Sequence, residues 1–249
     1  IAKTVEMLLL IGYTIKERPE FISFSVFKRI DWALFGRILK KGSLLIISQM
    51  MWVLSESFTA AIYNGRGNAA VVSGMAASFS IANLFFISFD GITTATGVLI
   101  GKSLGRNELD DARKEKTWML SAAIIFGCIM CLVGVVTVLL VPVVFGNLSI
   151  DAQNICRAML LLMALFMPLW TYVNTQLAVC RAGGDTKVGF LVDGGTTAVM
   201  IPMLLILAFF TNASPVMMYF GVKALDVGKI IVATHEMKKE RWVVNLSNG

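Results

Sequence analysis

The chain has 249 residues, of which 57% are hydrophobic and 15% charged, and its formal net charge is +6. A soluble domain is close to half apolar and one quarter charged, so this composition indicates a polytopic membrane protein. The positive charge does not indicate nucleic-acid binding, because the basic residues lie in short loops between long apolar segments.

The first 41 residues predict two elements that precede the main apolar region. Residues 1–15 form an apolar run that is too short to span a membrane and lacks the charged start and cleavage site of a signal peptide. We interpret it as the end of a preceding transmembrane helix and expect the chain to be a fragment of a longer protein. Residues 16–41 are expected to form a cytoplasmic linker. Its apolar residues recur at helical spacing, which favours a basic amphipathic helix on the inner leaflet over a helix packed on another cytoplasmic element: Phe27, Ile30, Leu34 and Ile38.

Six long apolar segments follow between residues 42 and 236, and a basic tail covers residues 237–249. Segments of this length predict transmembrane helices, so the expected fold is an all-α membrane protein with a six-helix bundle. The expected helices are 42–64, 69–100, 117–145, 155–180, 188–211 and 215–236.

Residues that favour helix ends lie between these segments. Gly183 and Gly184 suit a helix C-terminus. Side chains that suit helix N-caps precede four of the expected helices: Asn107, Ser149 or Asp151, Asp185, and Ser214, which Pro215 follows.

The distribution of basic residues predicts the orientation of the bundle. Most of the 22 Lys and Arg residues lie in residues 16–41, 102–116, 181–187 and 237–249, whereas the opposite loops hold only Arg66 and Arg157. Basic loops face the cytoplasm in membrane proteins. We therefore expect a multi-pass protein of the plasma (inner) membrane with a cytoplasmic C-terminus.

The sequence offers little for catalysis or metal binding. Cys128 and Cys131 form a C-x-x-C inside an apolar helix, where small packing residues are the simpler interpretation, and His235 is the single histidine. There is no catalytic triad, metal-binding motif or P-loop in the sequence. We expect no enzymatic activity, no metal and no cofactor.

Charged residues inside the expected helices predict a polar interior. A charge at mid-bilayer costs about 2.5–3.5 kcal/mol on insertion scales, so it usually faces a cavity or a partner. Neither Glu56 nor Asp90 has a basic residue at helical spacing in its own helix, and we expect both to line one cavity. Asp193, near the start of its helix, fits either an inner gate or exposure at the interface.

Two further groups of polar residues have two interpretations each. Lys223, Asp226 and Lys229 share one face of the last helix, either as a charge cluster solvated near its inner end or as a functional group. Neutral polar residues either face a wet interior or form hydrogen bonds between helices: Ser48, Gln49, Asn83, Thr171, Asn174 and Thr175.

Four stretches of the chain carry a resemblance to a known family. They are DWALFGRILKKG (31–42), VLIGKSLGRNELDDARK (98–114), CRAGGDTKVGFLVD (180–193) and LDVGKIIVATHEMKKERWVVNL (225–246). In order and spacing they resemble the C-terminal half of the multidrug and toxic compound extrusion (MATE) family of cation-coupled antiporters.

The resemblance implies a fold and a function. Members of that family have twelve spans in two six-helix lobes around a central cavity that opens alternately to each side. This chain would be the C-terminal lobe, with an N-terminal lobe as its partner, and it would export amphipathic or cationic small molecules in exchange for sodium or protons.

The polar residues inside the expected helices are assigned roles within this lobe. We expect Gln49, Glu56, Asn83, Asp90 and Asn174 to line the substrate and cation cavity, and Arg181 and Asp193 to act at the cytoplasmic gate. Family members commonly carry a Glu close to the position of Gln49. An amide does not titrate, so Glu56, one to two turns further on, is the expected substitute.

Two other functions are weighed against efflux. A lipid-linked oligosaccharide flippase of the same superfamily favours interior Arg or Lys residues that hold pyrophosphate. The apolar segments offer only Lys3, Lys223 and Lys229, which we place near inner ends, so this function ranks second. The other alternative is a six-helix membrane scaffold that transports nothing.

Overall fold

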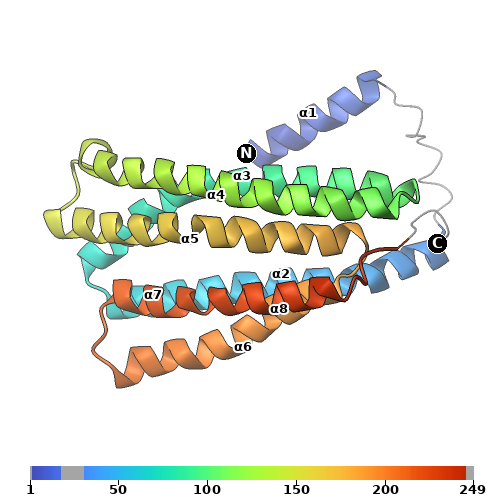
Figure 1. Cartoon of the computed structure of the whole chain (residues 1–249). Helices are drawn as coiled ribbons and strands as arrows, with labels where there is room; N and C mark the ends of the chain where they lie inside the picture. The colour runs from blue at the N-terminus through green and yellow to red at the C-terminus, as the bar shows by residue number, and fades with distance from the viewer. Residues whose placement is uncertain (1, 18–30, 245–249) are drawn as a thin grey trace. The chain divides into compact units, whose positions relative to one another are not determined.

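The computed structural model describes residues 2–17 and 31–244, and its regular structure within these residues is entirely helical (Figure 1). This confirms the prediction of an all-α membrane protein. The helices are α1 (Ala2–Glu17), α2 (Trp32–Arg66), α3 (Ala69–Gly105), α4 (Leu109–Val144), α5 (Ile150–Ala182), α6 (Lys187–Phe210), α7 (Pro215–Ala224) and α8 (Asp226–Lys238).

The chain divides into two compact units, Ile1–Gly42 and Ser43–Gly249. The first contains α1, most of whose described side chains are exposed, and the first turns of α2. Helix α2 passes through Gly42 without a break, although we expected a new helix to start there. Phe27 and Ile30 of the predicted amphipathic helix lie outside the described residues.

Helices α2 to α6 are each long and apolar enough to cross a membrane. The sixth predicted span is divided at Leu225 into α7 and α8, which follow one another in Figure 1. Leu225 has helical backbone angles (φ −64°, ψ −22°), but its N–H donates to the carbonyl of Val222, three residues back. This is a tight 3₁₀-type turn inside an otherwise helical segment.

Side-chain caps fix several helix starts. Asn68, Ser149 and Ser214 each accept a hydrogen bond from the backbone N–H three residues on, so two of the predicted caps are confirmed. The predictions for Asn107 and Asp185 were wrong. Asn107 adopts a left-handed conformation (φ 62°) and α4 starts after Glu108, while α6 starts after Thr186.

Glycines let α3, α4 and α5 approach one another closely. A Cβ atom added to Gly127 of α4 would overlap Pro168 and the hydroxyl of Thr171 on α5, and one on Gly134 would lie 2.7 Å from Cβ of Ala164. A Cβ on Gly74 of α3 would lie 2.5 Å from the carbonyl oxygen of Ala152. Small residues at such contacts are typical of helix packing in membranes. We call this three-helix contact the glycine seam.

One end of the 43–249 unit carries the α3–α4 turn, the α5–α6 turn and residues 239–244; we call it the basic end. Trp242 is buried there, with Lys116 over its ring at 5.9 Å. Arg113 of α4 forms an ion pair of 2.9 Å with Glu240, and this hydrogen bond lowers the pKa of the Glu240 carboxyl. These contacts attach residues 240–242 to α4, and the Trp242 backbone also lies against Gly183 of the α5–α6 turn.

Candidate functional site

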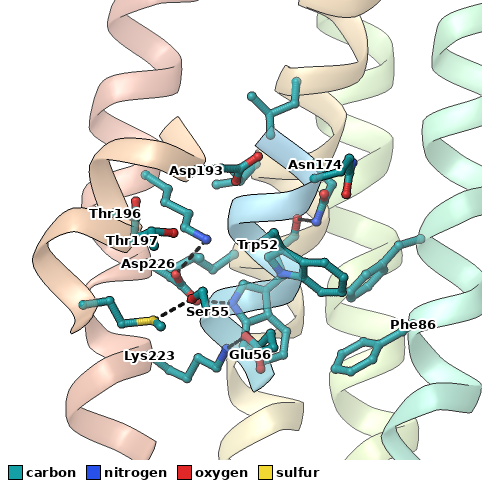
Figure 2. A pocket seen from close by; sticks show the side chains of 18 of the residues that line it. Trp52, Ser55, Glu56, Phe86, Asn174, Asp193, Thr196, Thr197, Lys223 and Asp226 are labelled. Atoms are coloured by element: carbon teal, nitrogen blue, oxygen red, sulfur yellow. Dashed lines mark hydrogen bonds and ion pairs between the residues drawn. The ribbon is translucent and has the colours of Figure 1, made fainter. Parts of the chain in front are cut away.

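An open cavity of about 970 Å³ in the 43–249 unit is lined by residues of α2, α3, α5, α6, α7 and α8 (Figure 2). Every residue that the sequence singled out for the cavity or the gate lies on its wall: Gln49, Glu56, Asn83, Asp90, Asn174, Arg181 and Asp193. The structure thus brings together residues from four helices. Their binding and gating roles stay predictions.

Glu56 has a charged partner on another helix. Its Oε1 lies 2.7 Å from Nζ of Lys223, and the side chains are 30% and 12% exposed. Figure 2 shows Lys223 pointing toward Glu56 across the cavity wall. The interpretation of Lys223 as a solvated member of an intrahelical cluster near the inner end was therefore wrong: it lies near the middle of the α7–α8 segment and joins α7 to α2.

Asp226, on the first turn of α8, is buried and has two partners. Its Oδ2 accepts a hydrogen bond of 2.8 Å from the indole N–H of Trp170, and its Oδ1 lies 3.1 Å from Nζ of Lys229. The Asp226–Lys229 contact confirms one part of the predicted intrahelical cluster. Together these bonds fix the Trp170 ring on the cavity wall.

Aromatic rings surround the Lys223 ammonium. Its Nζ lies 5.4 Å from the ring centre of Tyr219 and 5.7 Å from that of Trp170, within the range of cation–π attraction. Phe166 stacks on Trp170 at 5.8 Å and Phe86 meets it edge-on at 5.9 Å. Sequence reasoning missed this aromatic group, because its members come from three helices and show no local pattern.

Helix α2 is attached to α6 by polar contacts along its length. The Ser48 hydroxyl donates a hydrogen bond of 2.8 Å to Asp193, and the Ser55 hydroxyl contacts the sulfur of Met200. At the far end the Arg66 guanidinium donates to the backbone carbonyls of Leu207 and Thr211 at the C-terminus of α6. Asp193 is therefore bonded to a neighbouring helix.

Three cavity residues differ in how well their polar atoms are satisfied. The side-chain amide of Asn174 donates a hydrogen bond to the carbonyl of Trp170 on its own helix, so part of its hydrogen-bonding capacity is used within α5. Within the described residues, the Asp90 carboxylate has no hydrogen-bonding or charged partner. Among the residues that the structure describes, the Nε atom of Arg181 is buried without a hydrogen-bond partner, and a Cβ added to Gly189 of α6 would lie 4.0 Å from it.

The fold and this site define an all-α, multi-pass membrane protein with a cavity lined by charged residues, which is the architecture of a membrane transporter. A comparison with protein families matches the MatE family model to residues 45–207, from α2 almost to the end of α6. The chain belongs to the MatE family, whose members are transporters and not enzymes. No curated protein and no solved structure matched the chain.

Proposed function

We propose that this chain forms a six-helix lobe of a secondary active antiporter that exports organic cations and related amphipathic compounds. The observation that carries the proposal is the Asp90 carboxylate, which lines the cavity and lacks a charged partner among the described residues. A charge placed inside a membrane protein is costly unless a ligand, ion or partner compensates it. A cationic substrate and a coupling sodium ion or proton can both neutralise Asp90.

Competition for this carboxylate provides a way to couple the two movements. Binding of sodium or a proton removes the negative charge that retains the substrate, and release of the ion restores it. The resemblance to MATE antiporters supplies the second half of the mechanism: a partner lobe encloses the cavity, and the two lobes rock so that it opens alternately to each side. In this proposal the basic end faces the cytoplasm of a cell bounded by the plasma membrane.

The test is transport by this chain assembled with its partner lobe, in proteoliposomes under an imposed sodium or proton gradient. We expect uptake of tetraphenylphosphonium by the wild type and its loss in Asp90→Asn. The matched control is Asp151→Asn, the same change at an exposed carboxylate on the first turn of α5, outside the cavity lining. Unchanged uptake in Asp90→Asn removes Asp90 from the mechanism, and no uptake by the wild type rejects cation export.

Arg181 favours a second candidate, the lipid-linked oligosaccharide flippase. Its buried Nε has no hydrogen-bond partner in the described part of the chain, and Lys223 and Lys229 also line the cavity. The cavity wall therefore carries more basic residues than the sequence suggested. Pyrophosphate is a natural ligand for such a group. Translocation of a fluorescent polyprenyl-pyrophosphate lipid that is lost in Arg181→Gln, in protein that does not move tetraphenylphosphonium, would establish this function instead.

A further inference from the structure

The Lys223 ammonium occupies a position with the chemistry of an organic-cation site. It lies 2.7 Å from a carboxylate oxygen of Glu56 and within 6 Å of the ring centres of Tyr219 and Trp170. A carboxylate beside aromatic faces is the arrangement by which proteins bind ammonium and phosphonium ligands. Here the protein's own side chain fills it.

The walls of this position are held in place by contacts other than those of Lys223. The indole of Trp170 is fixed by its hydrogen bond to Asp226 and by the stacked ring of Phe166. Tyr219 is 1% exposed and contacts the rings of Tyr63 and Phe79. The aromatic faces therefore keep their positions when the ammonium leaves, so the site is preorganised for a second cation.

A ligand in the cavity can also reach the carboxylate. Glu56 is 30% exposed and lines the same cavity as Trp170 and Lys223. The Lys223 ammonium sits on a four-carbon stem with free rotation, so it can move into the cavity without a change in the backbone. A ligand cation can then replace the Lys223 ammonium, and the main free-energy cost is the loss of the contacts that the ammonium made.

We propose, resting on the organic-cation function above, that Lys223 is a tethered occupant of the substrate site. A lipophilic cation with aryl or alkyl groups binds by displacing the Lys223 ammonium from Glu56 and from the faces of Trp170 and Tyr219. Lys223 thereby sets a threshold for binding, because only cations that replace its contacts are retained. The displacement also breaks the ion pair that joins α7 to α2.

The first experiment measures tetraphenylphosphonium binding by titration calorimetry to the full chain in lipid nanodiscs. Lys223→Gln removes the charge and keeps an N–H donor for Glu56; we expect it to bind at least about tenfold tighter than wild type, as loss of a desolvated cation–π competitor predicts. Lys223→Arg keeps the occupant and should bind as weakly as wild type. Lys114→Gln is the matched control, because Lys114 pairs with Asp111 near the start of α4 and lies outside the cavity lining.

A neutral probe distinguishes displacement of the Lys223 ammonium from a simple gain of space in the Lys223→Gln cavity. Neutral triphenylphosphine oxide should bind Lys223→Gln and wild type equally. If both probes gain affinity, the variant has merely made space and the proposal is wrong. Equal or weaker tetraphenylphosphonium binding by Lys223→Gln also overturns it but leaves cation export standing, provided that the wild type transports the probe. Absence of both binding and transport in every variant rejects cation export together with this proposal.

A second measurement on the wild type does not depend on any variant. We expect tetraphenylphosphonium to increase the rate at which an amine-reactive reagent modifies Lys223, read by mass spectrometry, because the displaced ammonium becomes accessible. Lys114, outside the cavity lining, should react at an unchanged rate in the same protein. A Lys223 rate that stays constant or falls at saturating probe contradicts displacement.

Discussion

At the scale of single residues, the ion pair between Glu56 and Lys223 is the most consequential contact in the cavity. The two residues come from α2 and α7, and Lys223 is the more buried member, at 12% exposure. Removing one partner of a buried pair leaves the other charge uncompensated, whereas removing both does not. The loss of folding stability should therefore be larger when one of the two residues is changed than when both are.

We expect Glu56→Gln to lower the free energy of unfolding by about 3 kcal/mol, since it leaves the Lys223 ammonium without its carboxylate. Thermal and denaturant unfolding of the full chain in nanodiscs would measure the loss. The double variant Glu56→Gln/Lys223→Gln should recover most of it. If Glu56→Gln is as stable as wild type, the ion pair does not stabilise this conformation.

At the scale of structural elements, the C-terminal tail depends on a glycine in the α5–α6 turn. A Cβ atom on Gly183 would overlap the carbonyl oxygen of Trp242, whose side chain is buried at the basic end. We expect Gly183→Ala to destabilise the protein by about 3 kcal/mol, because the tail must move away. The free energy of unfolding measures this loss. Faster proteolysis after Lys238 or Lys239 would show that the tail has left its position.

Gly228→Ala is the control for this prediction. Gly228 lies inside α8 with no atom within 4 Å of an added Cβ, so alanine should leave stability unchanged or raise it slightly through helix propensity. A Gly183→Ala protein that is as stable as Gly228→Ala would show that the tail does not need its contact with the α5–α6 turn.

The elements themselves were largely predictable, because hydropathy and helix caps are local signals. The apolar segments and the side chains of Ser149 and Ser214 placed most helix ends close to the observed ones, but α2 and α4 begin at Trp32 and Leu109 and not near residues 42 and 117. The turn at Leu225 escaped prediction because no Gly or Pro marks it. Asn107 was misassigned because a short polar residue suits both an N-cap and a left-handed turn.

The site was predictable only in part, for a physical reason. The free-energy cost of a charge inside the bilayer identified Glu56 and Asp90 as candidates for the cavity, and both line it. The partner of Glu56 could not be identified, since Lys223 is 167 residues away and only tertiary packing brings the two together. The same holds for the contact of Trp170 with Asp226.

At the scale of the whole molecule, the two ends of the bundle differ in charge. The proposed orientation places the α3–α4 turn inside the cell and the α4–α5 turn outside. We expect Arg106→Cys to react with a membrane-impermeant maleimide only after permeabilisation, and Asn147→Cys to react in intact cells. Both side chains are exposed, and the native cysteines are replaced by serine in these variants. The opposite labelling pattern would invert the proposed topology.

The contrast between the glycine seam and the cavity wall has a consequence for how the protein adapts. Seam residues such as Gly127 and Gly134 touch neighbouring helices so closely that larger side chains do not fit. Gln49 and Trp52 of α2 are exposed side chains that line the cavity, so their replacement disturbs little packing. If the protein exports organic cations as proposed, selection by a new toxic compound should favour substitutions on the cavity side of α2 while the seam stays unchanged. Substrate range can then evolve without loss of the fold that supports it.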